Sequence, residues 1–186
     1  MKGIEVVADF NRQRMPHEVE HPFLPGIHTP MTEELTLQDR PVTGTIPAAL
    51  DGRYLRIGPN PVAPDPAGYH WFTGDGMVHG IAVKQGKALW YRNRWIRSSE
   101  VGKARGVAPA PGPRHGGFDT VNTNVIGMAG RTFALVEAGS YPVELSDTLD
   151  EQTYNPFDDT LLGSFPPPPH LRPPPGLPPP PPPHPP

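Results

Sequence analysis

The stretch Tyr69–Gly80 holds more residues able to do chemistry than any other part of the chain. It contains three aromatic residues, two histidines, one aspartate and three glycines. His70 and His79 could in principle share a metal ion. A glycine turn separates them, however, and their spacing is not a known ligand spacing, so packing or hydrogen bonding is predicted for both. Asp75 has a glycine on each side and is predicted to cap its own turn.

The chain before this stretch contains further histidines but no motif. Residues 1–40 are polar, and their prolines are spaced too closely for a helix to persist between them, so we predict an extended arm that lies over the body of the protein. The arm carries His17, His21 and His28. Polar side chains in an exposed arm are mostly solvated, which favours solvated histidines over metal ligands.

The elements that must position these side chains are predicted to be short strands. Strands are expected at residues 42–46, 53–57, 77–84, 87–97, 120–126, 132–137 and 142–145. Gln85-Gly86 is typical of a two-residue hairpin turn. Residues 98–117 are rich in glycine and proline and are expected to form a long loop.

The sequence shows no convincing helical period, and it allows one helical turn at residues 47–50. Apolar and charged residues alternate along the strand predicted at 87–97, as on a half-buried antiparallel strand. Leu89, Tyr91 and Trp95 fall on one face, and Arg92 and Arg94 on the other. The chain is therefore predicted to be all-β, and its periodicity does not choose between a sandwich, a barrel and a propeller.

Composition and charge exclude several classes of function. The net charge is −3 over 186 residues and no cluster of basic residues is present, which argues against a nucleic-acid partner. The chain has no cysteine, which removes disulfides, thiolate metal sites and cysteine nucleophiles. No apolar run has the form of a signal peptide or approaches the ~18 residues of a transmembrane helix. A cytoplasmic protein without a transmembrane segment is therefore expected.

Several blocks of the chain, taken in order, resemble the carotenoid cleavage oxygenases, a family that includes the retinal-pigment-epithelium isomerase and the bacterial lignostilbene dioxygenases. The resemblance runs from about Pro41 to Phe165 and is closest to actinobacterial members. The blocks are residues 43–47 (TGTIP), 51–56 (DGRYLR), 58–61 (GPNP), 72–79 (FTGDGMVH), 122–125 (NTNV) and 137–139 (EAG).

The resemblance implies a seven-bladed β-propeller that holds a non-haem Fe(II) on four histidines. Four neutral imidazoles suit Fe(II) and leave positions open for O2. The implied activity is oxidative cleavage of one conjugated double bond of an apolar polyene or stilbene into two carbonyl products. Such substrates dissolve in membranes, so peripheral contact with a membrane surface is a further expectation.

The chain matches the family's site only in part. Glu137 matches a glutamate that accepts the second N–H of an iron-bound imidazole and so fixes its orientation; without the resemblance it would be an ordinary strand-end glutamate in solvent. Pro168 occupies the position of the first histidine ligand, His170 matches a later histidine that is not a ligand, and the other ligands would lie after residue 186. The resemblance thus implies no catalytic residue and no iron ligand here. The positions of the family's structural motif are Gly74, Asp75, Gly76 and His79.

The resemblance also predicts how the chain is organised. Residues 41–165 are expected to form the first blades of the propeller, between the arm of residues 1–40 and a proline-rich tail of residues 166–186. A chain of this extent is expected to be an N-terminal fragment that covers somewhat over a third of the family's length. Such a fragment is predicted to be inactive and to bind no iron by itself.

The tail allows two interpretations. Fifteen of the 30 prolines lie in residues 166–186, which is typical of a disordered or polyproline II segment. Such a segment could bind SH3 or WW-type modules, and the chain would then be a non-enzymatic interaction protein. Alternatively, Phe165, Pro169, Leu171 and Gly176 stay in register with the family, and several prolines differ from the family residue by one base. We therefore hypothesise a sequence error at the end of a partial gene.

Overall fold

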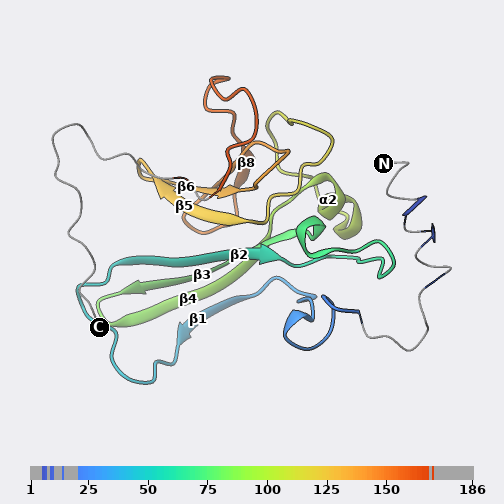
Figure 1. Ribbon diagram of the computed structural model, residues 1–186. Coiled ribbons are helices and arrows are strands. Elements are labelled where there is room, and N and C mark those ends of the chain that lie inside the picture. The colour runs from blue at the N-terminus through green and yellow to red at the C-terminus, as the bar shows by residue number, and fades with distance from the viewer. Residues whose placement is uncertain (1–5, 8, 11–13, 15–20, 168, 170–186) are drawn as a thin grey trace, which may run out of the picture.

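The structure is a computed structural model that describes residues 6–7, 9–10, 14, 21–167 and 169. Its elements are η1 (Gly26–His28), β1 (Thr36–Arg40), β2 (Gly52–Pro59), η2 (Trp71–Thr73), β3 (Gly76–Lys84), β4 (Lys87–Trp95), α2 (Ser99–Arg105), β5 (Asn124–Met128), β6 (Arg131–Leu135), β7 (Val143–Leu145) and β8 (Gln152–Tyr154). They form two antiparallel sheets stacked in two layers (Figure 1). The mostly β architecture confirms the predicted class.

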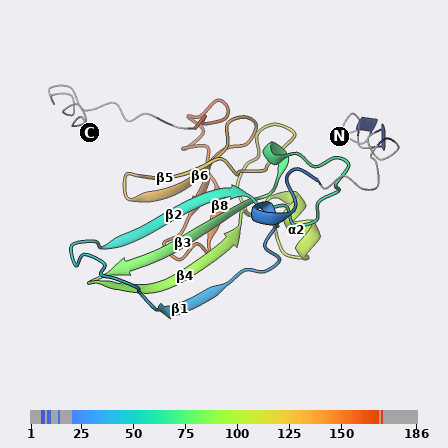
Figure 2. The same ribbon diagram turned by 60° about the horizontal axis from the view of Figure 1, so that its bottom comes forward.

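The first sheet has the strand order β1-β4-β3-β2, and the four strands lie side by side in Figure 2. β3 and β4 are joined by Gln85 and Gly86, whose φ angles of 49° and 77° confirm the predicted two-residue turn. β2 pairs with β3 along its whole length. β1 adds to the far edge of the sheet, where Thr36 pairs with Arg92.

The second sheet, β5-β6-β7-β8, follows the order of the chain. β5 and β6 are joined at Ala129 and Gly130, which have φ angles of 51° and 75° and form a second tight hairpin. β8 is the last strand of the sheet and pairs with β7, with Val143 opposite Tyr154. Short connections of this kind keep each strand next to its predecessor.

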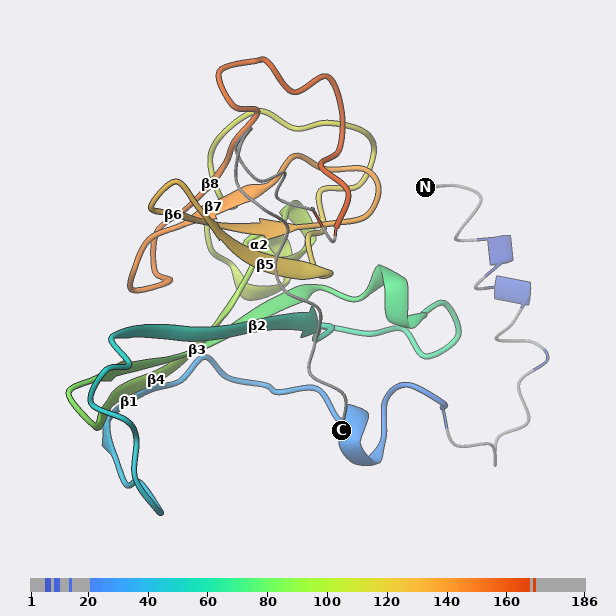
Figure 3. The same ribbon diagram turned by 60° about the vertical axis from the view of Figure 1, so that its left-hand side comes forward.

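A hydrophobic core lies between the two sheets, because the second sheet packs across one face of the first (Figures 1 and 3). Along β2 the side chains alternate as a half-buried strand requires: Leu55 and Ile57 pack on the core, whereas Tyr54 and Arg56 are exposed on the other face. The core residues with no exposed surface are Val78, Ile96, Val121, Ala134, Val143 and Leu149.

A smaller core lies on the other side of the first sheet, beneath α2. It consists of Met77, Trp95 and Val101, with Met31 and Val62 packed against it. Met31 comes from the segment just before β1, so this core attaches the N-terminal segment to the sheet.

The alternation along β4 suggests that the face with Arg92 and Arg94 is exposed to solvent, and the structure shows otherwise. This face is turned toward the second sheet, where Trp90 packs against the interlayer core. Arg92 Nη1 and Arg94 Nε each donate to the carboxylate of Asp150 at 2.7 Å. Burial by itself would raise the pKa of Asp150, but the hydrogen bond and charge of Arg94, together with Thr148 and Arg92, lower it. The charged residues therefore join the two layers.

Asp150→Asn is expected to lower the free energy of unfolding by about 1–2 kcal/mol at pH 7, because charge-assisted hydrogen bonds are worth ~1.5–3 kcal/mol and partial exposure screens them. Since the folded pKa lies below the unfolded value of ~3.9, this contribution is complete above about pH 5 and is lost as the pH falls through the folded pKa. Urea unfolding of both forms at several pH values measures the difference. Asp147→Asn is the control, because the Asp147 side chain is 87% exposed. Equal losses in the two variants would contradict the prediction.

Several predicted elements are wrong or incomplete. Residues 42–46 are not a strand, and Gly44 has a φ of 89°, which breaks an extended conformation there. The loop predicted at 98–117 begins with α2, which Ser98 caps by accepting from the N–H of Val101 and which ends at Gly106 with a φ of 66°. Strands β1 and β8 were not predicted.

Only part of the predicted arm is extended. Residues 6–7, 9–10 and 14 have helical backbone, η1 is a single 3-10 turn, and β1 belongs to the sheet. Residues 170–186, most of the predicted tail, lie outside the described residues, as does Pro168. In the part of the chain that the structure describes, no helix is long and apolar enough to span a membrane.

Candidate functional site

The loop formed by residues 69–76, here called the motif loop, is built around the short helix η2. The His70 ring accepts the N–H of Phe72 at 3.3 Å, and the hydroxyl of Thr73 donates to the His70 carbonyl at 2.9 Å. The first of these bonds satisfies a backbone N–H group that has no partner within the first turn of a helix. The hydrogen-bonding role predicted for His70 is confirmed.

Asp75 attaches the motif loop to the end of β2. Its carboxylate accepts the N–H of Val62 at 2.9 Å, and its carbonyl accepts the N–H of Asn60 at 2.5 Å. Burial raises its pKa, and the charges of Glu100 and Asp119 add to this, while the N–H of Val62 acts in the opposite direction. The sequence predicted that the Asp75 carboxylate caps its own turn. In the structure it bonds to a neighbouring segment instead.

The motif loop is also fixed to the segment that leads into β5 of the second sheet. The side-chain amide of Asn122 donates to the carbonyls of Phe72 at 3.1 Å and Gly74 at 2.7 Å. The backbones approach so closely that a Cβ atom on Gly76 would lie 1.8 Å from the carbonyl oxygen of Val121. Only glycine fits at this position.

This junction leaves a small cavity of about 180 Å³, here called the glutamate cavity, lined by Phe72, Asn122, Thr123, Val136, Glu137 and Ala138. Glu137 follows the end of β6 and is exposed. No described residue forms a hydrogen bond or an ion pair with its carboxylate. The hydroxyl of Thr123 is close by and donates to Asn122 Oδ1 at 3.1 Å. The cavity therefore offers one uncommitted carboxylate as a hydrogen-bond acceptor.

An apolar cavity of about 290 Å³ adjoins the first and shares Phe72, Val136 and Ala138 with it. Phe72 is 76% exposed and Phe118 is 54% exposed, although both are large and apolar. Exposed aromatic residues on a cavity rim are typical of a surface that binds an apolar molecule. The carboxylate and the apolar wall thus lie next to each other.

The residues at this junction do not form an iron site by themselves. Glu137 is the single ionisable residue of the glutamate cavity, and the described part of the chain contains no group of three or more His, Cys, Asp or Glu residues that could hold a metal. An Fe(II) centre needs several such ligands. Glu137 can accept a hydrogen bond from a ligand but cannot replace a set of ligands.

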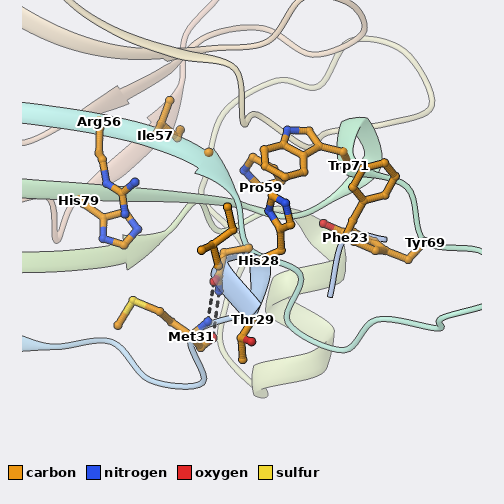
Figure 4. A pocket seen from close by; sticks show the side chains of 13 residues that line it. Phe23, His28, Thr29, Met31, Arg56, Ile57, Pro59, Tyr69, Trp71 and His79 are labelled. Carbon is orange, nitrogen blue, oxygen red and sulfur yellow. Dashed lines mark hydrogen bonds between the residues drawn. The ribbon is translucent and has the colours of Figure 1, made fainter. Parts of the chain in front are cut away.

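His79 lies on the exposed face of the first sheet, away from the glutamate cavity. Its Nδ1 is 2.9 Å from the hydroxyl of Tyr91, which confirms the predicted hydrogen-bonding role. Arg56 is its cross-strand partner on β2, and the two side chains lie together at one end of a third cavity (Figure 4). Burial, together with the charge of Arg56, lowers the pKa of His79 to about 4. His79 is therefore neutral at pH 7.

We expect His79 to titrate near pH 4 in an NMR pH series, well below the ~6.5 of a free histidine. Between these pH values the unfolded chain binds a proton that the folded chain does not, so stability falls as the pH decreases from ~6.5 toward 4. His79→Gln should remove this part of the pH dependence. A His79 titration near pH 6.5 would contradict the assignment.

A family model described as retinal pigment epithelial membrane protein matches residues 28–174. The chain belongs to this family. The match starts before Pro41 and extends beyond Phe165, so the likeness is longer than the sequence blocks suggest. A protein similar to this chain is the carotenoid cleavage oxygenase of Mycobacterium tuberculosis, which is 55% identical over 152 residues. These residues are 80% of this chain and 30% of that protein, so the chain spans about 30% of the relative's length.

Two solved structures have a fold similar to that of this chain. Lignostilbene dioxygenase of Pseudomonas brassicacearum has a TM-score of 0.57 at 24% identity and covers 82% of this chain, which matches 32% of that chain. A variant of the Synechocystis apocarotenoid oxygenase has a TM-score of 0.59 at 22% identity and covers 74% of this chain and 32% of its own. At these identities the likeness establishes the fold alone.

The sequence predictions identified some of the residues at this junction. Glu137, Gly74, Asp75 and Gly76 lie at or beside it, whereas His79 lies on the opposite face of the first sheet. Asn122 and Thr123 were noted only as part of a family block, and no role was predicted for them. A buried polar side chain must have hydrogen-bond partners, and this rule would have indicated a role for Asn122. The sequence does not show that Asn122 is buried, because its burial depends on how the two sheets pack.

Proposed function

We propose that this chain forms part of a non-haem Fe(II) dioxygenase that adds O2 across a conjugated double bond of a carotenoid, apocarotenoid or stilbene and gives two carbonyl products. The observation that carries the proposal is the 55% identity to a carotenoid cleavage oxygenase over 80% of the chain. The name of that relative supports the choice of substrate class. The whole protein is the enzyme in this proposal, and this chain alone is inactive.

We further propose that the two sheets are the first two blades of a seven-bladed propeller. Both sheets have four antiparallel strands, and β2 and β5, the first strands of the two successive meanders, contact each other. Strands that start successive blades lie nearest the axis of a propeller, which fits this arrangement. The iron would then lie near the axis, and its ligands would come from parts of the protein outside the described residues.

The residues of the junction have separate roles in this proposal. Phe72 and Phe118 provide apolar surface for the polyene or stilbene and exclude water from it. Glu137 accepts the N–H of an imidazole that binds the iron, which holds the ring in one orientation. Asn122 positions Phe72 through the hydrogen bond to its carbonyl. When bound, the iron supplies the activation of O2.

A chimaera tests the proposal directly. Residues 1–165 of this chain are joined to the part of the Mycobacterium tuberculosis carotenoid cleavage oxygenase that follows the corresponding position. We expect the chimaera to bind iron and to cleave an apocarotenoid into two carbonyl products, detected by chromatography and mass spectrometry. A second chimaera that retains residues 166–176 of this chain, with Pro168 in place of the ligand, is expected to lose iron.

A folded chimaera that binds iron but cleaves neither an apocarotenoid nor a stilbene would contradict the proposed activity. Full iron content in the second chimaera would contradict the assignment of Pro168 to a ligand position. The two outcomes are independent, because the first reports on residues 1–165 and the second on the tail.

A further inference from the structure

A cavity of about 220 Å³ lies between the two sheets; we call it the intersheet cavity. Its walls come from the end of β4, the end of α2, the segment before β1 and the start of β8. The lining residues used below are Glu34, Arg94, Arg97, Arg105, Asp150 and Gln152. The volume is several times that of one water molecule and below the ~300–1,000 Å³ of sites for drug-sized molecules, so it suits a small ion.

The walls of the intersheet cavity belong to sheets that pack directly on each other. In the proposed propeller these sheets are successive blades. β2 and β5 then lie nearest the axis, and β1 and β8, at the opposite edges of the two sheets, lie at the outer rim. No further blade enters between two successive blades. The cavity is therefore formed by residues of this chain, and closure of the propeller adds no blade to it.

Asp150 and Arg94 are fully bonded to their neighbours. The Asp150 carboxylate accepts from Arg92 Nη1 and from Arg94 Nε at 2.7 Å each. Arg94 also donates to the carbonyl of Leu35 at 2.8 Å and to the hydroxyl of Thr36 at 2.7 Å. With a further bond to a backbone carbonyl and a second contact to Asp150, all of its N–H groups are in use. This pair has no donor left for a ligand.

Arg105 is bonded only in part. Its Nη2 donates to the carboxylate of Glu34 at 3.4 Å, and its guanidinium lies 4.3 Å from the ring centre of Trp95. The other carboxylate oxygen of Glu34 accepts the backbone N–H of Trp95 at 2.9 Å. The remaining N–H groups of Arg105 donate to no described residue. Arg105 therefore has donors available in the cavity.

Arg97 has no carboxylate partner within the described chain. Its Nη2 reaches the carbonyl of Asp150 at 3.4 Å, and its buried Nε–H group donates to no described residue. The backbone of Arg97 is fixed, because its N–H donates to Gln152 Oε1 at 2.9 Å and its carbonyl accepts the N–H of Ala110 at 2.8 Å. A partly buried charge without a partner is unfavourable, and an anion in the cavity would neutralise it.

We propose that the intersheet cavity binds a tetrahedral oxyanion, a phosphate or sulfate group, on Arg97 and Arg105. Guanidinium groups match oxyanions through paired N–H donors. A tetrahedral anion has oxygens outside a single plane, so it can accept from two guanidiniums on different elements, whereas a planar carboxylate matches one. The inference does not depend on the proposed oxygenase activity, and the cavity shares no lining residue with the glutamate cavity.

Titration calorimetry of this chain with inorganic phosphate tests the proposal, with the ionic strength held constant by sodium chloride. We expect saturable binding of phosphate and of sulfate, and at least about tenfold weaker binding of acetate. Glycerol 3-phosphate separates the two sources of such a group: tighter binding than that of phosphate indicates a phosphate ester, and weaker binding indicates the free ion.

Two substitutions at Arg97 test its role. Arg97→Met should bind phosphate at least about tenfold more weakly. Arg97→Lys keeps the charge but not the paired donors and should lie between the two. Arg40→Met is the matched control, because Arg40 is an exposed arginine on β1 outside the cavity. Circular dichroism confirms that each variant is folded.

The melting temperature separates loss of binding from loss of folding. Without phosphate, Arg97→Met should be at least as stable as the unmodified chain, because methionine keeps an apolar stem and removes an unpaired charge. With phosphate, the unmodified chain should melt at a higher temperature, and Arg97→Met should not change.

Absence of saturable phosphate binding up to about 10 mM would overturn the proposal. Acetate binding as tight as that of phosphate would overturn it as well, and so would equal phosphate affinity in Arg97→Met and Arg40→Met. A lower melting temperature of Arg97→Met without phosphate would also contradict it, because Arg97 would then already have its partner within the chain.

Discussion

Gly76→Ala is expected to remove most of the stability of the folded chain. The new Cβ atom would lie 1.8 Å from the carbonyl oxygen of Val121, 2.8 Å from its carbonyl carbon and 3.2 Å from the Cα atom of Asn122. All three are backbone atoms, so no side-chain rotation relieves the contact. The segment at residues 121–122 must move away from β3.

This movement affects both the core and the motif loop. Val121 has no exposed surface in the interlayer core, and Asn122 donates to the carbonyls of Phe72 and Gly74. Overpacking costs ~1–3 kcal/mol or more and each lost hydrogen bond ~1 kcal/mol, so we expect a loss of about 3–5 kcal/mol. Small domains are stable by only ~5–15 kcal/mol. Urea unfolding measures the change.

Gly127→Ala is the matched control for this prediction. Gly127 is also a strand glycine, in β5, but a Cβ atom there would meet no atom within 4 Å and its φ is not positive. Alanine should be neutral or slightly stabilising at this position. A Gly76→Ala protein as stable as the Gly127→Ala protein would show that the two segments separate easily, and the close approach would then have no energetic role.

Glu137→Gln is expected to lower the activity of the chimaera with the Mycobacterium relative by about 10–100-fold, because loss of the partner of a metal-bound imidazole typically has an effect of that size. Glutamine keeps the shape of the side chain but removes its charge and part of its capacity to accept the imidazole N–H. The expected change is in iron affinity and in turnover. Iron content by metal analysis and product formation by chromatography measure the two effects separately.

The stability of the isolated chain separates this role from a structural one. Glu137 is exposed and no described residue bonds to its carboxylate, so Glu137→Gln should leave the unfolding curve of the chain unchanged. Glu151→Gln is the control, because Glu151 is also an exposed glutamate but lies beside β8, away from the glutamate cavity. If both variants of the chimaera keep full activity, Glu137 has no role in the site.

The parts of the fold that could be predicted from the sequence are those specified by local chemistry. Gln85-Gly86 identifies a hairpin by itself, and β2, β3 and β4 have the composition of strands. Helix α2 was missed because seven residues are too few for a hydrophobic period, although Ser98 and Gly106 are recognisable caps. Strands β1 and β8 depend on pairing with distant partners, which no short stretch of sequence reveals.

The candidate site was predictable only through the family resemblance. Glu137 is an unremarkable glutamate until β6 and the motif loop place it in a cavity. Asp75 was predicted to cap its own turn, whereas it lies between the bend at Gly74 and β3, and its bond to Val62 depends on how the end of β2 passes the loop. The alternation along β4 indicated which residues share a face but not which face meets the second sheet. The packing between the two sheets decides which face of β4 is covered, and the pattern of residues along a single strand does not reveal that packing.

The position of β1 at the edge of the first sheet has a consequence for the order of folding. β3 and β4 are joined by two residues and can pair within microseconds, and β5 to β8 also form through short connections. β1 must find β4 by closing the long loop between Thr36 and Arg92, which costs more chain entropy before any contact forms. We expect the amide protons of β1 to gain protection last. Until then the outer edge of β4 is unpaired, and the nascent chain presents an open template for another strand.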